Sequence, residues 1–441
     1  MRNRAKYLTS VILFAVFCLL SACRSNRPPT ADVATKSAEH QDQTNSRQTG
    51  EDSKDADIPT ESTEEDADQN FNRFSPQMCC SGGSLYFFEH LMSGNRFLKV
   101  YEPESDVSFP VCGKAECTHN NAECNSWLNE GSNSIGLTRY QGKIYWINFL
   151  FRENAYVLWR MDRDGTHHEF VRKLGSGTGE DAPPTGNVYI QIHRGVLYVA
   201  GYNADITDGV HSLHLLVKAY DLDSDKEETL FDYDAGTENT GGILMQCFRE
   251  KVYILALDVK MTGEGFALTE DGRYQSKIMI LTYDIASGRM DTVFDEMGLG
   301  YAPSEIIADE DGLAMLAYKT PDGICRSLLY WKQGGAKLEE IRDLGDMEGR
   351  LVSLGEGKLI SYSGKDLSQI NIDVYDLEGK LLAENSYRID DGLKVSTIYY
   401  VGCDADNLYY EYSYGDTASG KLAVAAYPLS GASAKLIYVE E

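Results

Sequence analysis

The stretch YQGKIYWINFLFRENAYVLWRMDRDGTHHEFVRKL, residues 140–174, decides the fold. Its apolar and aromatic residues gather in short runs at 144–149, 156–161 and 169–174. Gly142 directly precedes the first run, and Gly165 lies between the second and the third. Short runs of β-branched and aromatic residues bounded by turn residues are typical of strands. The stretch therefore predicts antiparallel strands joined by tight turns.

The same pattern recurs from about residue 74 to the C-terminus. The aliphatic residue at the core of each copy falls at positions 85, 144, 197, 252, 313, 359 and 408, so the copies are 46 to 61 residues apart. Each copy also carries a later strand that ends in an aromatic residue or Met, a short final strand and a short preceding strand. Four short strands per repeat of this length are typical of a β-propeller blade.

We therefore predict an all-β fold, a β-propeller of seven four-stranded blades over residues 71–441. Each copy supplies its own four strands, so we expect no strand exchange to close the ring. The fifth to seventh copies are weaker, which leaves six or eight blades as the alternative counts. An open solenoid or a pair of β-sandwiches is the competing architecture.

Composition and charge limit the partners. The 441 residues include 28 tyrosines and 40 glycines but only 11 prolines, and the net charge is −27. Such an acidic chain repels nucleic acid and anionic lipid. The charge suits a monomeric surface protein, and it permits a cationic partner without requiring one.

The first 22 residues form a predicted signal peptide. Arg2, Arg4 and Lys6 precede an apolar run at 11–20, which is too short to span a bilayer as a helix. The following Leu-Ser-Ala-Cys at 20–23 resembles the lipobox of bacterial prolipoproteins. The resemblance implies cleavage between Ala22 and Cys23, with diacylglycerol attached to Cys23. The alternative is an ordinary secretory signal with an incidental cysteine.

Residues 23–70 form a predicted tether. They contain no aromatic residue, and between Glu51 and Asn70 nine residues are acidic and one is basic. Such a segment buries too little apolar surface to offset its ordering entropy, so we predict disorder. A spacer of this kind would let the propeller stand off the membrane while the lipid stays in it. An acidic cation-binding tail is the alternative.

A distinct insert, at 110–127, lies between the first and second copies. It contains Cys112, Cys117, His119 and Cys124, and Cys79 and Cys80 lie upstream. Outside the cytoplasm we favour a disulfide, either within the insert or to one of the two upstream cysteines. Zinc is the alternative, because three thiolates and an imidazole make an acceptable tetrahedral set. The spacing matches no standard zinc knuckle, so we assign no metal and no other cofactor.

The lipobox, acidic tether, propeller repeats and Cys/His insert together resemble a group of uncharacterised β-propeller lipoproteins of Gram-positive anaerobic bacteria, which carry a domain of unknown function. The resemblance covers nearly the whole chain. It implies a place in the bacterial cell envelope, anchored by lipid on the extracytoplasmic side of the membrane. It brings no activity with it.

The sequence nominates no catalytic residues. We therefore expect a binding module for a protein or carbohydrate ligand, with the long loop at 261–276 as the preferred contact. The alternatives are an envelope enzyme that acts on polysaccharide, a lyase or glycosidase, and a scaffold subunit of an envelope assembly. Six tyrosines between residues 399 and 414 could line a sugar-binding surface, but we interpret them as packing between blades. Cys247, Cys325 and Cys403 are isolated and predicted to be buried.

Overall fold

The structure is a computed structural model, and it describes the greater part of the chain from Met78 to Glu440. The described ranges are 78–81, 83–90, 96–128, 135–150, 152–176, 182–184, 186–207, 210–262, 265–321, 326–345, 351–355, 357–366, 369–389, 395–404, 406–414 and 421–440. The predicted signal peptide, lipidation site and tether, and Cys325, lie outside these residues. None of the described residues forms a helix able to cross a membrane.

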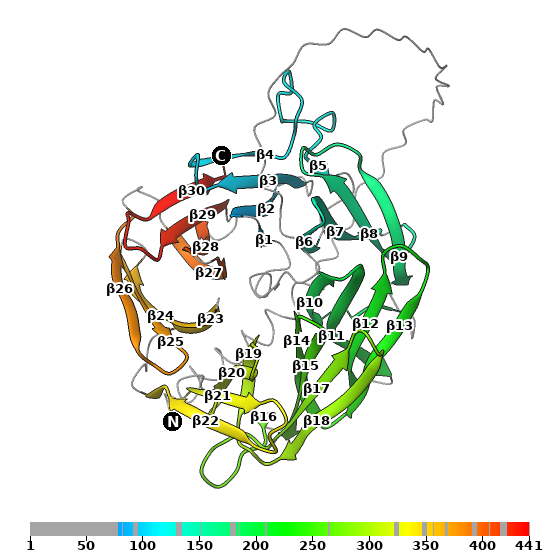
Figure 1. Ribbon diagram of the computed structural model, residues 1–441, viewed down its shortest axis with the longest axis vertical. Helices are drawn as coiled ribbons and strands as arrows, with labels where there is room; N and C mark the ends of the chain where they lie inside the picture. Colours follow the sequence, from blue (N-terminus) through cyan, green and yellow to red (C-terminus); the bar gives the residue numbers. More distant parts are fainter. Residues whose placement is uncertain are drawn as a thin grey trace. The chain divides into compact units, whose positions relative to one another are not determined.

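Within the described ranges, thirty strands form seven antiparallel sheets, which we number as blades in chain order (Figure 1). Blade 1 contains β1 (Met78–Ser81), β2 (Ser84–His90), β3 (Arg96–Glu102) and an outer strand in two pieces, β4 (Val107–Pro110) and β5 (Trp127–Leu128). Blade 2 contains β6 (Ile135–Tyr140), β7 (Lys143–Leu150), β8 (Ala155–Asp162) and β9 (Glu169–Ser176). Blade 3 contains β10 (Gly186–His193), β11 (Val196–Thr207), β12 (Val210–Asp221) and β13 (Glu227–Gly236).

The remaining blades follow the same order. Blade 4 contains β14 (Asn239–Phe248), β15 (Lys251–Thr262), β17 (Ser276–Asp284) and β18 (Arg289–Met297), with the short β16 (Gly265–Phe266) paired to β15. Blade 5 contains β19 (Ala302–Ala308), β20 (Gly312–Tyr318), β21 (Arg326–Lys332) and β22 (Leu338–Asp343). Blade 6 contains β23 (Leu351–Gly355), β24 (Lys358–Asp366), β25 (Gln369–Asp376) and β26 (Leu381–Tyr387). Blade 7 contains β27 (Val395–Cys403), β28 (Asn407–Tyr414), β29 (Lys421–Pro428) and β30 (Lys435–Val439).

The sheets stand around a ring, with β1, β6, β10, β14, β19, β23 and β27 innermost (Figure 1). The prediction of a seven-bladed propeller is confirmed. Each described blade is built from strands that are consecutive in the chain, so the prediction of a ring without strand exchange is also confirmed.

The deciding stretch folds as its turn residues predict. Gln141 and Gly142, between β6 and β7, both have positive φ, 46° and 73°, as the mirror-image hairpin turns require. Gly165 (φ 78°) lies in the turn between β8 and β9. The predicted strands at 144–149, 156–161 and 169–174 are observed as β7, β8 and β9.

The core consists of layers between neighbouring blades, because successive side chains of a strand point to opposite faces. On β15, Val252 and Ile254 pack against blade 3, while the alternate Tyr253 and Leu255 pack against blade 5. The tyrosines of blade 7 follow the same rule. Tyr409, Tyr410 and Tyr412 are at most 2% exposed, which confirms the packing interpretation for these three.

A polar link is repeated on the inner strands of successive blades. A side-chain oxygen of one inner strand accepts a hydrogen bond from a backbone N–H of the next. The pairs are Gln191 Oε1 with Cys247 N (2.6 Å), Gln246 Oε1 with Ala308 N (2.7 Å) and Glu305 Oε2 with Leu354 N (2.5 Å). Because an innermost strand is a sheet edge, its outward N–H groups have no ladder partner within the blade. These side chains supply one and set the stagger between blades.

Side chains close the ring between blades 7 and 1. The Tyr438 hydroxyl donates a hydrogen bond to Glu89 Oε1 (2.6 Å), and Lys99 Nζ lies 3.0 Å from the same oxygen. Phe87, Tyr409 and neighbouring apolar residues fill the layer beneath these polar groups.

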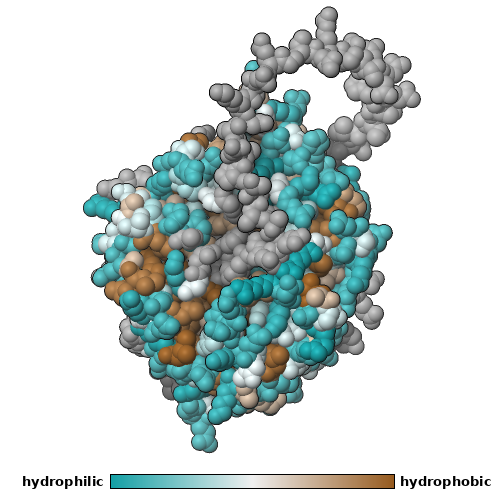
Figure 2. Space-filling model, in the orientation of Figure 1, coloured by the Kyte–Doolittle hydropathy of each residue, from teal (hydrophilic) through white to brown (hydrophobic). Residues whose placement is uncertain are grey.

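Figure 2 shows hydrophilic residues over most of the visible face, interrupted by smaller hydrophobic patches.

Candidate metal centre

The Cys/His insert is a loop, residues 111–126, that interrupts the outer strand of blade 1. β4 and β5 pair with the same strand, β3, on either side of the loop. Val111 N–H donates to the Leu98 carbonyl (2.9 Å), and Leu98 N–H donates to the Ser126 carbonyl (2.9 Å). Both ends of the loop are therefore held at one residue of β3. We predicted this loop between two blades from the sequence. In the structure it lies inside the fourth strand of blade 1 (Figure 1, cyan).

The loop also contacts the β8–β9 turn of blade 2. Gly113 N–H donates to the Asp164 carbonyl (2.8 Å), and His168 Nε2 lies 2.7 Å from the Asn125 carbonyl. Because a carbonyl only accepts, His168 must carry its proton on Nε2. At the base of the loop, Val111 is buried in a layer that includes Met161 of β8. The loop thus joins two blades.

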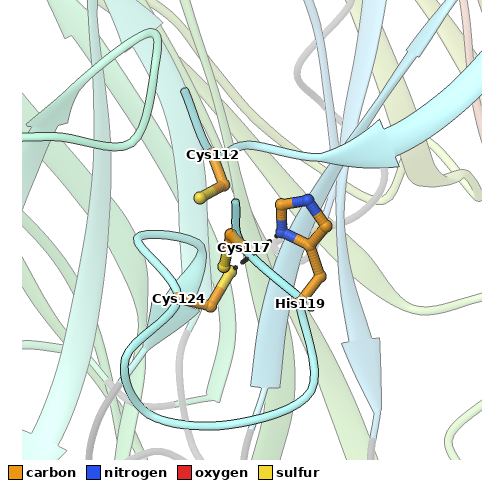
Figure 3. Close-up of side chains that lie close together, drawn as sticks. All are labelled: Cys112, Cys117, His119 and Cys124. Atoms are coloured by element: carbon orange, nitrogen blue, oxygen red, sulfur yellow. Dashed lines mark hydrogen bonds between the residues drawn. The ribbon is translucent and has the colours of Figure 1, made fainter. Parts of the chain in front are cut away.

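Four side chains of the loop converge (Figure 3). The sulfur atoms of Cys112, Cys117 and Cys124 and a ring nitrogen of His119 all lie within 4.8 Å of one another. We call these residues the Cys3His cluster. His119 Nδ1 lies 3.3 Å from Cys124 Sγ. His119 has a positive φ of 54°, a conformation that histidine adopts more often than most residues.

The loop backbone favours negative charge on one sulfur. Burial opposes ionisation of Cys112, but backbone N–H groups of Lys114 and Asn125 and the neighbouring thiols donate to its sulfur, and its pKa is lowered. Cys124 is 4% exposed, and this burial raises its pKa to about 11 although Ser126 donates to it.

The donor set fits zinc. Three sulfurs and one imidazole nitrogen form a common tetrahedral shell, in which Zn–S bonds of about 2.3 Å place the sulfurs about 3.8 Å apart. The cluster would need to contract by roughly 1 Å from its largest separation to reach this geometry. With four protein donors, the shell would leave no open position for substrate, which is the property of a structural site.

The structure does not bring the upstream cysteines to this cluster. Cys79 and Cys80 lie on β1, the innermost strand of blade 1, and three strand spacings, about 14 Å, separate it from the outer strand. The two side chains face opposite sides of the sheet: Cys79 packs toward blade 2 and Cys80 toward blade 7. Cys112, Cys117 and Cys124 carry free thiols in the structure. Cys247 and Cys403 are buried, as predicted.

The residues of blade 2 that contact the loop could not be identified from the sequence. His168 lies 43 residues after Asn125, and Gly165 lies 54 residues after Val111. Nothing in their local sequence pattern indicates these contacts. The Trp146 ring packs edge-on against His168, with ring centroids 5.7 Å apart. An exposed histidine beside a turn thus becomes a docking residue only once the blades are in place.

Comparisons with known proteins find similar solved structures but no matching sequence family. No protein-family model matches the chain, and no curated protein sequence matches it. Among solved structures, it is similar to one from a study of two prolyl endopeptidases (13% identity, TM-score 0.48), covering 84% of this chain and 50% of that one. The chain thus spans about half the length of that enzyme.

Two other similar structures are covered over nearly their whole length. One is the β-propeller domain of the trilobed protease from Pyrococcus furiosus, described as having an open velcro topology (10% identity, TM-score 0.45, covering 83% of this chain and 98% of that one). The other is a polysaccharide lyase, an ulvan lyase (8% identity, TM-score 0.48, covering 83% and 95%). At these identities the similarity is one of fold alone.

Proposed function

We propose that the protein is a lipid-anchored, extracytoplasmic binding protein. Its propeller would hold a protein or carbohydrate ligand of the cell envelope or its surroundings through the hairpins of blades 3 and 4. The observation that carries the proposal is the extension of these two neighbouring blades. The N-terminal lipobox motif, with Cys23 as the lipidated residue, supports the anchor.

Blades 3 and 4 have the longest strands of the ring. β11, β12 and β15 each contain 12 residues, whereas the other second and third strands contain 7 to 9. The extra residues lie at the connection between the second and third strands in both blades. Because neighbouring blades have the same topology, these two hairpins leave the ring on the same side.

The blade 4 hairpin is held on a folded base. After β15 the chain turns back, so that Phe266 pairs with Met261 and Leu268 bridges to Tyr274. Tyr274 is buried against Val259 and Ala302. Leu268 remains 41% exposed. A rigid base that presents an exposed apolar residue is suited to binding, because little ordering entropy is lost when a partner docks.

The polar residues of the inner strands favour binding over catalysis. Gln191, Gln246 and Glu305 are engaged in the links between blades described above. His193, fully buried, lies with Nε2 2.6 Å from the Arg249 carbonyl. These side chains therefore hold neighbouring blades at a fixed offset from one another. Their hydrogen bonds would have to break before the side chains could act on a substrate.

Binding to isolated cell-wall polymer and to a panel of purified polysaccharides tests the proposal. The lipid-free protein is compared with Leu268→Ser and with Leu382→Ser, which alters a leucine of β26 that is 50% exposed. We expect Leu268→Ser to weaken binding about tenfold, which corresponds to about 1.4 kcal/mol, and Leu382→Ser to leave it unchanged. Equal binding by all three proteins would refute the blade 3 and 4 surface. Shortened oligosaccharides in the reaction mixture would favour the polysaccharide-acting enzyme instead.

A further inference from the structure

We propose that the Cys3His cluster is a structural zinc site that fastens the outer strand of blade 1 to the β8–β9 turn of blade 2. The inference is independent of the ligand-binding role. It concerns a different part of the ring and a different chemistry, and either proposal can fail without the other.

The first argument is convergence within a closed loop. All four donors belong to residues 111–126, and backbone hydrogen bonds at Leu98 hold both ends of this loop. Within the loop, Lys114 Nζ donates to the Glu123 carbonyl (2.6 Å), which ties the segment carrying Cys112 to the segment carrying Cys124. The donors are therefore positioned by the fold, and little chain entropy remains to be lost when a metal ion binds.

The second argument is the presence of the imidazole. A disulfide between any two of the three cysteines would leave one thiol and His119 without a role. The structure instead places His119 Nδ1 3.3 Å from Cys124 Sγ, and the left-handed backbone of His119 supports this position. Only a tetrahedral metal ion uses all four groups at once.

The third argument is the chemistry of binding. Zn²⁺ would replace the protons of three thiols, releasing three protons, and would accept the lone pair of a neutral imidazole. The product carries a single net negative charge. Backbone N–H groups of Lys114 and Asn125 already donate to Cys112 Sγ, and N–H donors of this kind stabilise metal-bound thiolates. No oxidant or reductant is required.

The consequence is a bond between blades. The loop reaches blade 2 through Gly113 and Asn125, which directly follow Cys112 and Cys124. If both cysteines bound one zinc ion, the contacts of Gly113 and Asn125 with blade 2 would therefore be held in place as well. The described ring exchanges no strand between blades, so such a fastening would add cohesion where the blades otherwise meet only through side chains and loops.

The test is the metal content of the lipid-free protein, purified without oxygen and without chelators. We expect elemental analysis by mass spectrometry to find one zinc ion per chain. After removal of zinc, we expect Co²⁺ to produce the visible absorption of a tetrahedral thiolate site. Cys117→Ser and His119→Ala should weaken metal binding at least about 100-fold, since loss of even an outer-shell partner costs 10–100-fold.

Thr118→Ala is the matched control, because Thr118 lies inside the loop and its hydroxyl contacts only the Asn120 side chain (2.8 Å) among described residues. This variant should retain zinc. Wild-type protein that takes up neither zinc nor cobalt while its thiols are reduced would overturn the proposal. A disulfide between two of Cys112, Cys117 and Cys124, found by peptide mapping of protein from intact cells, would overturn it too. Both readouts use the wild-type chain, so a variant that misfolds does not obscure the result.

Discussion

Gly165 and Val111 are packed so closely that a Cβ atom on Gly165 would lie 2.1 Å from the Val111 carbonyl oxygen. Gly165 belongs to the β8–β9 turn of blade 2. Val111 is the first residue of the blade 1 loop (111–126) that carries the Cys3His cluster. The contact shows that the loop and its neighbour's turn are complementary at the level of single atoms. The turn requires glycine twice, for its positive φ and for this approach.

Replacement of Gly165 by alanine should therefore loosen the junction of blades 1 and 2. A non-glycine residue with positive φ costs about 1–2 kcal/mol, and the clash with a backbone oxygen adds to this cost. Gly142→Ala is the control, because Gly142 has a similar φ (73°) but no atom within 4 Å of its added Cβ. In urea unfolding, Gly165→Ala should be the less stable of the two variants. Equal stabilities would show that the close contact contributes nothing.

The link between inner strands gives a second prediction, at Glu305. Its Oε2 accepts from Leu354 N–H (2.5 Å), as an amide oxygen of glutamine does in the two preceding blades. Glu305→Gln keeps an acceptor and should be nearly neutral. Glu305→Met removes it and leaves the Leu354 N–H without that partner, at a cost of about 1–3 kcal/mol. Urea unfolding of both variants measures the difference, and similar losses would contradict the role of the acceptor.

The fold could be predicted because its signals are local. Gly142 and Gly165, and the aromatic residues between them, lie within one blade. The pattern recurs seven times along the chain, so the blade architecture and the favoured count of seven follow from its spacing. The closure of the ring could be predicted for the same reason, since each copy contains four strands.

The candidate site was predicted only in part. The spacing of Cys112, Cys117, His119 and Cys124 identified the residues, and the structure brings all four together. It does not bring Cys79 and Cys80 to them, because those residues lie on the inner edge of the sheet, and strand order in space is not visible in cysteine spacing. The contacts to Gly165 and His168 depend on how two sheets stack, which no local pattern encodes.

A third prediction concerns acid stability and Glu340 of β22. Partial burial opposes ionisation of this carboxyl, but the Lys319 ammonium (2.8 Å) and the hydroxyls of Tyr301 (2.6 Å) and Ser327 (2.8 Å) outweigh it. Its pKa is lowered from an ordinary 4.5 to about 2. A lowered folded-state pKa means that the charged form stabilises the fold, fully above pH 4.5 and progressively less as pH falls toward 2.

Glu340→Gln should therefore be less stable than wild type at neutral pH, and the gap should narrow as the pH falls from about 4.5 to about 2. Thermal unfolding across this range measures the gap. Glu339→Gln, at the neighbouring exposed position of the same strand, is the control and should show no such trend. A gap that stays constant with pH would mean that the charge of Glu340 is not what stabilises blade 5.

The final prediction tests closure of the ring without a shared strand. Tyr438 of β30 and Glu89 of β2 are 349 residues apart in the chain, yet their hydrogen bond of 2.6 Å joins the last blade to the first. Tyr438→Phe keeps the ring of the side chain and its packing on Phe87 (centroids 5.3 Å apart) but removes the donor. A hydrogen bond to a charged group contributes about 1.5–3 kcal/mol, so we expect a loss in that range by urea unfolding.

Tyr156→Phe is the control for this closure, because the Tyr156 hydroxyl makes no hydrogen bond to another described residue. The change at Tyr438 should also increase hydrogen exchange in β1 and β30 before the other blades, since opening at the seam exposes those strands first. Uniform exchange around the ring would instead mean that the apolar layer beneath the seam holds blades 7 and 1 together by itself. In that case the polar contacts would set the alignment of the two blades and not the strength of their association.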